Sequence, residues 1–157
     1  IRATEYLIGK ITPYALMATA QMLLIAAGGL LWFRVPFNGS VWVVLTGLAL
    51  FMLTCIGIGL LISLVSRTRH QAQQAMMFLM IPTMVLSGFI FPVQSMPAII
   101  QPLTKLIPLT WALDVLRGAF VKGSSFTALA VPLLALAGFA VVIFGAAIVA
   151  TRRRISE

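Results

Sequence analysis

Four long runs without a charged residue constrain this chain more than any other feature of its sequence. They are residues 11–33, 41–65, 75–91 and 126–150. About 20 apolar residues in a helix are enough to cross the hydrocarbon core of a bilayer, which is about 30 Å thick. We therefore expect an all-α fold, a polytopic transmembrane helical bundle with four spans. The third run is the weakest of the four, because it is short and contains Pro82, which favours a kink.

The composition excludes a water-soluble domain. Only 9% of the residues are charged and 61% are hydrophobic, whereas a soluble domain carries roughly 25% charged residues. Such a chain cannot cover a surface that faces water. The 157 residues suit a single transmembrane domain, 1–157, and the absence of an initial Met leads us to expect a piece of a longer protein.

The net charge of +8 predicts membrane topology rather than nucleic-acid binding, because the basic residues flank the apolar runs. With the N-terminus inside, seven basic residues lie on the inner side and four on the outer side. The inner residues are Arg2, Lys10, Arg67, Arg69, Arg152, Arg153 and Arg154, and the outer residues are Arg34, Lys105, Arg117 and Lys122. We expect a multi-pass protein of the bacterial cytoplasmic (inner) membrane with both ends cytoplasmic, and no nucleic-acid partner.

Polar residues inside the runs are few, and none is Asp, Glu, Lys or Arg. This pattern is unlike that of an ion-coupled transporter, which uses charged groups at membrane depth. The single cysteine, Cys55, has no partner for a disulfide and is expected to be a small buried side chain. Gly59 and Ser63 have the four-residue spacing of small residues that allows helices to approach closely. No cluster of residues suggests a metal site or a catalytic site.

The segment 92–125 is apolar but is interrupted by four prolines and four charged residues. We expect a re-entrant or interfacial hairpin of two short helices broken at Pro108. Thr110 is expected to cap the second helix, and Gly123 to end it. Asp114 and Arg117 have the spacing of an ion pair. An ordinary amphipathic loop that serves only in packing is the alternative.

Four apolar residues of the second of these helices are expected to share one leucine-rich face. That face consists of Leu109, Leu113, Leu116 and Phe120.

Three phrases resemble the type-2 family of permeases of ATP-binding-cassette (ABC) transporters. Residues 86–97 read LSGFIFPVQSMP, residues 107–118 read IPLTWALDVLRG, and the opening residues 1–10 read IRATEYLIGK. The resemblance covers essentially the whole chain in order. It implies a complete permease of six spans, of which these four would be the last, with segment 92–125 matching the re-entrant helices of the family.

The resemblance also implies partners. These are a nucleotide-binding ATPase subunit or domain, a second permease subunit, and membrane lipid. The chain has no G-x-x-x-x-G-K-[ST] phosphate loop, so we expect no enzyme activity and no cofactor in it, with ATP used by the partner. The implied function is an exporter that moves a hydrophobic or amphipathic substrate. The alternative is a non-transporting anchor or assembly subunit of a larger complex.

Two sets of candidate functional residues follow from the resemblance. The first set would contact the ATPase, although anchoring to anionic lipid explains the same basic residues equally well. It consists of Arg2, Thr4, Glu5, Lys10, Arg67 and Arg69. The second set belongs to the re-entrant hairpin and consists of Gly88, Pro92, Pro97, Pro108, Asp114 and Arg117.

Overall fold

In a computed structural model of the protein, residues 3–32, 39–120, 122–123 and 126–155 are described. Only the backbone is described for residues 3–7, 10, 25–26, 29–30 and 152–155. Every regular element in this described part is helical, which confirms the all-α class. In chain order the elements are α1 (Ala3–Leu31), α2 (Val41–Val65), α3 (Arg69–Leu86), η1 (Val93–Ser95), α4 (Gln101–Thr104), α5 (Pro108–Phe120) and α6 (Ala130–Ile155).

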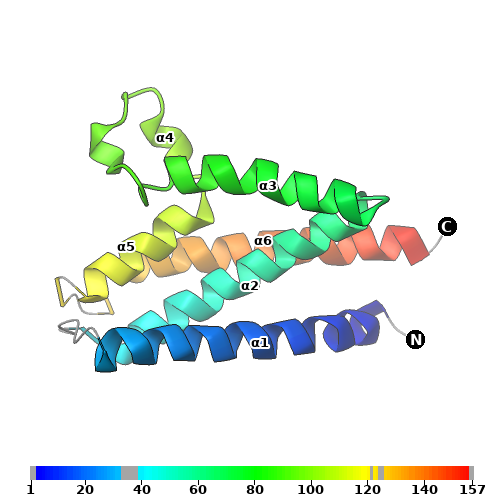
Figure 1. The fold of residues 1–157 in the computed structure, drawn as a ribbon, viewed down its shortest axis with the longest axis horizontal. Helices are drawn as coiled ribbons and strands as arrows, with labels where there is room; N and C mark the ends of the chain where they lie inside the picture. The colour runs from blue at the N-terminus through cyan, green and yellow to red at the C-terminus, as the bar shows by residue number, and fades with distance from the viewer. Residues whose placement is uncertain (1–2, 33–38, 121, 124–125, 156–157) are drawn as a thin grey trace.

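The four long helices run back and forth along the molecule (Figure 1). One end of the bundle holds the start of α1, the turn between α2 and α3, and the end of α6; we call it the α2–α3 end. The opposite end, where α5 leads towards α6, we call the α5–α6 end. The three short elements η1, α4 and α5 lie beyond the C-terminal end of α3 and on the bundle beside it.

The helices and the uncharged runs agree best at α2, which covers the same residues as the second run, 41–65. Among the described helices, α2 and the stretch Ala130–Thr151 of α6 are long and apolar enough to cross a membrane. A shorter apolar stretch, Ile11–Leu24, lies within α1. Helix α1 begins before its run because a helix continues through polar residues as readily as through apolar ones.

Helix α3 differs most from its run, since it begins at Arg69 and not at residue 75. Thr68 accepts a hydrogen bond from the Gln71 backbone N–H at 3.1 Å, and the Arg67 backbone N–H donates to Gln71 Oε1 at 2.9 Å. The pair Thr68 and Gln71 has the spacing of a capping box, which satisfies the free N–H groups of the first turn. The polar connection expected at residues 66–74 is therefore mostly the first turns of α3, which continues through Pro82 to Leu86.

The core lies between α2, α5 and the start of α6. Leu136 and Val43 are completely buried, and Val115 of α5 is 1% exposed. A Cβ atom on Gly47 would lie 2.7 Å from Val115 Cγ1, and one on Gly57 would lie 2.6 Å from Ile143 Cγ2. The absence of a side chain at these two glycines lets α2 approach α5 and α6 closely, as tight helix packing in lipid requires.

The expected close approach at Gly59 is not observed. A Cβ atom on Gly59 would meet nothing within 4 Å, because this face of α2 borders a pocket and not another helix. Cys55, which we expected to be buried, is exposed on the same face.

Candidate functional site

Helix α5 lies against the bundle through a face of small residues. Its first residue is Pro108, which suits the start of a helix because its φ is fixed and no N–H is needed there. Beyond its last turn, Gly123 has a φ of 58°, the left-handed conformation that glycine adopts without strain. The buried residues of α5 are Thr110, Ala112, Val115, Gly118 and Ala119.

The predicted leucine-rich face of α5 is not the face that is buried. Leu109, Leu113, Leu116 and Phe120 are only half-buried, at the edges of the buried face. Small residues occupy its centre because α5 comes too close to its neighbours for larger ones. A Cβ atom on Gly118 would lie 2.5 Å from Leu129 Cδ2. The four leucine and phenylalanine side chains cover the margins of this contact.

Two side chains in the first turn of α5 donate hydrogen bonds to backbone carbonyls of the turn before the helix. Thr110 Oγ1 donates to the Thr104 carbonyl at 2.7 Å, and this bond is buried. Trp111 Nε1 donates to the Lys105 carbonyl at 2.8 Å. Thr110 is thus not the cap that we expected, since the helix begins two residues earlier and its hydroxyl ties α5 to the end of α4.

Arg117 connects α5 to the end of α3. One of its guanidinium nitrogens donates to the carbonyl of Gly88 at 2.6 Å, across 29 positions of the chain. Gly88 is buried and has a φ of 84°, and a Cβ atom there would lie 2.9 Å from Val93 Cγ2. Two of the predicted hairpin residues, Gly88 and Arg117, are therefore in direct contact.

Asp114 and Arg117 form no ion pair in the described part of the chain, so their expected pairing is wrong as a contact. The charge of Arg117 still acts on the Asp114 carboxylate. Burial raises the pKa of Asp114 above its ordinary value of 3.8, and the positive charges of Arg117 and Lys122 oppose this rise. Arg117 is directed to Gly88 because a buried carbonyl at a helix end needs a donor more than a half-solvated carboxylate does.

The prolines of segment 92–125 mark the ends of its short elements. The Pro92 carbonyl accepts from the Ser95 N–H at 2.9 Å, and the Pro97 carbonyl accepts from the Ile100 N–H at 2.9 Å. Pro108 begins α5. Each proline stands where a turn starts and no N–H is needed, which is why this segment contains short helices and not a regular span.

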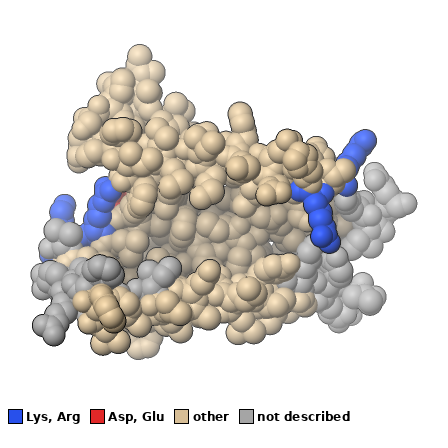
Figure 2. Space-filling view, in the orientation of Figure 1, with Lys and Arg blue, Asp and Glu red and all other residues tan. Residues whose placement is uncertain are grey.

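The predicted ATPase-contact residues lie at or near the α2–α3 end. Arg67 and Arg69 are exposed at the turn. Thr4, Glu5 and Lys10 are described by their backbone alone, within α1, and Arg2 lies outside the described residues. Lys and Arg side chains gather at both ends of the face in Figure 2, and the described surface between them carries none.

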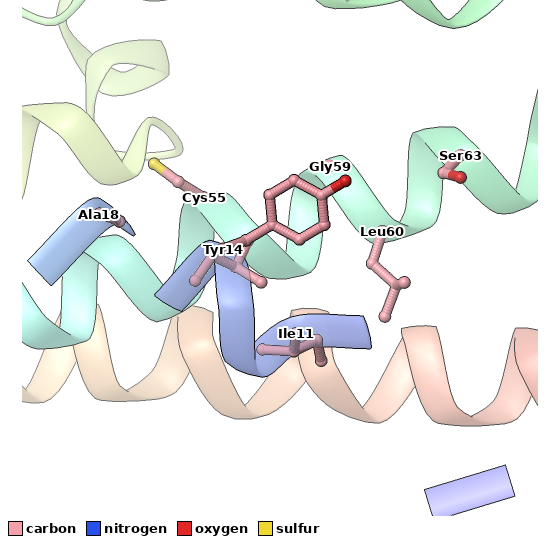
Figure 3. A pocket seen from close by; sticks show the side chains of 8 residues that line it. Ile11, Tyr14, Ala18, Cys55, Gly59, Leu60 and Ser63 are labelled. Carbon is pink, nitrogen blue, oxygen red and sulfur yellow. The ribbon is translucent and has the colours of Figure 1, made fainter. Parts of the chain in front are cut away.

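A pocket of about 430 Å³ lies between α1 and α2, towards the α2–α3 end. Figure 3 shows Tyr14 projecting from α1 towards α2, with Cys55, Gly59 and Ser63 along one side of α2. This pocket was not predicted from the sequence. Three small residues, Cys55, Gly59 and Ser63, follow one another at four-residue spacing on α2, but we interpreted only Gly59 and Ser63 together, as a surface for helix contact. The remaining lining residues are Ile11, Ala18, Ile56 and Leu60.

Comparison with known proteins gives a consistent picture. The family described as "ABC-2 family transporter protein" matches residues 1–149. The probable multidrug ABC transporter permease YbhS of Escherichia coli K12 is 35% identical over 156 residues, which are 99% of this chain and 41% of YbhS. The E. coli permease YbhR, also named a probable multidrug ABC transporter permease, is 32% identical over 77% of this chain and 33% of its own length.

A third relative is the linearmycin resistance permease protein LnrN of Bacillus subtilis 168. It is 30% identical over 73% of this chain and 30% of its own length. The chain thus spans about two-fifths of the length of the first of these relatives and less of the others. No solved structure matches the chain.

Proposed function

We propose that this chain, which belongs to the ABC-2 family of transporter proteins, is part of the membrane-spanning permease of an ATP-driven exporter. The observation that carries the proposal is the family match over residues 1–149, which includes the hairpin as well as the apolar helices. Two relatives are named as probable multidrug permeases and one as a linearmycin resistance permease. These names and the uncharged helices favour a hydrophobic or amphipathic substrate.

The proposed topology has four crossings, by α1, α2, α3 and α6, with both ends of the chain in the cytoplasm. The α2–α3 end would then face the cytoplasm, and α5 would dip into the membrane from the outer side. The alternating course of the four helices supports this arrangement (Figure 1). So does the distribution of basic residues, seven at the proposed inner side and four at the outer side.

ATP hydrolysis is assigned to a separate or fused nucleotide-binding partner. Its contact would involve Arg67 and Arg69, which are exposed at the turn, and Glu5 near the start of α1. Charged groups at such an interface set register and orientation of the partner. Arg2, Thr4 and Lys10 belong to the same proposed surface.

A second permease subunit is part of the proposal. None of the residues of α3 is buried, although the helix carries large apolar side chains. Phe78, for example, is 82% exposed. A helix so little covered by its own chain is expected to face lipid or further membrane-spanning segments, and the rest of the permease and a second subunit supply such segments.

Charge reversal at the proposed contact tests this function. The complete permease with its ATPase is purified in mild detergent, and export is followed with a set of fluorescent amphiphilic dyes in cells. Glu5→Lys and Arg69→Glu are expected to keep membrane insertion but to separate ATP hydrolysis from dye export. Lys122→Glu, at the opposite end, serves as the control. Recovery of the permease without any nucleotide-binding partner would contradict the proposal and favour a non-transporting anchor.

A further inference from the structure

The pocket between α1 and α2 is suited to a ligand that is mostly apolar. Its volume of about 430 Å³ lies within the range of small-molecule sites, which is about 300–1,000 Å³. Its walls are aliphatic except for the Tyr14 and Ser63 hydroxyls and the Cys55 thiol. The backbone of α2 at Gly59 is open to the pocket, because a Cβ atom there would meet nothing within 4 Å.

Two hydroxyl groups at this pocket form no hydrogen bond within the described part of the chain. Four threonine hydroxyls of α1 and α2, those of Thr12, Thr19, Thr46 and Thr54, each donate to the carbonyl four residues before them, as Thr12 does to Ile8 at 2.6 Å and Thr54 does to Leu50 at 2.8 Å. Neither Tyr14 nor Ser63 donates a hydrogen bond to another described residue. A hydroxyl at membrane depth needs a partner, because lipid tails offer none, and a ligand with polar groups near its chain provides one.

The pocket lies close to a positively charged turn. Ser63 is two residues before the end of α2 at Val65, and the exposed Arg67 and Arg69 follow. No acidic residue lies between Ser63 and Arg69 in the sequence. Basic sites between membrane helices on the cytoplasmic side bind anionic lipid headgroups, so the charge of the turn complements a negatively charged headgroup above an apolar pocket.

We infer that the α1–α2 pocket binds one acyl chain of an anionic phospholipid, whose headgroup lies at Arg67 and Arg69. These two exposed residues would then serve both the headgroup and the proposed ATPase contact. The chain occupies the space beside Gly59, and the Tyr14 and Ser63 hydroxyls face its ester groups. The inference depends on the apolar character of α2, which is long enough to cross a membrane, and not on the proposed export of a substrate. It makes this pair of helices a lipid site distinct from the hairpin.

Photolabelling tests the inference. The complete permease is reconstituted in vesicles of equal parts phosphatidylethanolamine and phosphatidylglycerol, the latter with a photoactivatable group near the end of one acyl chain. Labelled peptides are mapped by mass spectrometry. We expect stronger labelling of residues 11–18 and 55–63 than of the exposed α6 surface at Val141 and Val142. Equal labelling of the two surfaces would mean general contact with bulk lipid and would overturn the inference.

Filling the pocket is the decisive variant. Gly59→Leu projects a side chain into the open space and is expected to lower labelling of the pocket peptides about tenfold, which corresponds to the loss of about two buried methylene groups. Gly145→Leu on α6 is the matched control, because a Cβ atom there also meets nothing within 4 Å. Unchanged labelling in Gly59→Leu, in protein that retains its normal size-exclusion profile, would overturn the inference.

A comparison of two lipid probes tests the contact between the headgroup and the turn. Replacing both Arg67 and Arg69 by Gln is expected to remove the preference of the pocket for phosphatidylglycerol over a phosphatidylcholine probe with the same chain. The preference is expected to fall at least about fivefold, since one juxtamembrane basic residue contributes about 1 kcal/mol to binding of anionic lipid. A preference that survives both substitutions would contradict the assignment of the headgroup to this turn.

Discussion

The contact between Arg117 and Gly88 is open to a quantitative test, because a single side chain makes it. Arg117→Gln removes the charged donor and leaves the buried Gly88 carbonyl, now bonded at 2.6 Å, without a partner. A hydrogen bond to a charged group contributes about 1.5–3 kcal/mol, and an unsatisfied buried acceptor costs about 1–3 kcal/mol. Since Arg117 itself is exposed in part, we expect a loss of about 2 kcal/mol, near the middle of both ranges.

The expected loss translates into a measurable change in melting temperature. For a domain of this size, 1 kcal/mol corresponds to about 2–4 °C, so Arg117→Gln should lower the apparent melting temperature of the purified permease by about 4–8 °C. Arg117→Lys should recover part of the loss, because lysine keeps one charged donor but not the planar group of arginine. All variants are compared in one detergent at one scan rate, since unfolding of membrane proteins is often irreversible.

Lys122→Gln is the control for charge, because it removes the same positive charge two residues beyond the end of α5. Its melting temperature should change by less than about 1 °C, as for most exposed charges. If Arg117→Gln and Lys122→Gln lower the melting temperature equally, then Arg117 acts through its charge alone. In that case the hydrogen bond to Gly88 does not hold the hairpin to α3, and our reasoning is refuted.

Three further changes probe the same region. Because burial raises the pKa of Asp114 above its ordinary value of 3.8, stability should be greatest below pH 3.8 and fall as the pH rises through the higher folded-state pKa; Asp114→Asn should abolish that fall in thermal unfolding followed over a pH series. Thr110→Val should cost about 0.5–1.5 kcal/mol, because the Thr104 carbonyl loses one of its two donors and keeps the Ile107 N–H, whereas Thr110→Ser should stay near wild type. In Gly39→Ala, the new methyl group would clash with the Ala119 backbone, so the amount of folded permease recovered should fall; a normal recovery would contradict the close contact between Gly39 and Ala119.

The sequence predicted the helical class and the bounds of α2 because lipid imposes simple demands. A span must be long, apolar and helical, and the run 41–65 meets these demands so fully that α2 has the same bounds. The prolines likewise predicted an interrupted hairpin, since Pro108 must begin a helix or break one. These inferences rest on rules that act within a few neighbouring residues.

The features that we did not predict depend on distant contacts or on a local signal that we passed over. Spacing within α5 pointed to Asp114 as the partner of Arg117, but the partner is Gly88, 29 positions away. The spacing of the apolar residues predicted a leucine-rich face on α5. The residues that α5 buries are smaller ones on another face, where α2 approaches closely at Gly47. The start of α3 was readable from Thr68 and Gln71, whose spacing is that of a capping box, so that error was avoidable.

Helices α3 and α5 differ in how many of their residues the rest of the chain buries, and this difference has a mechanical consequence. Helix α5 buries five of its residues against α2 and α6, so displacing it breaks a tightly fitted contact. Helix α3 buries none within the described part of the chain, and the Arg117 bond to the Gly88 carbonyl joins its C-terminal end to α5. Any force applied to α3 would therefore reach the tightly packed α2, α5 and α6 through Arg117.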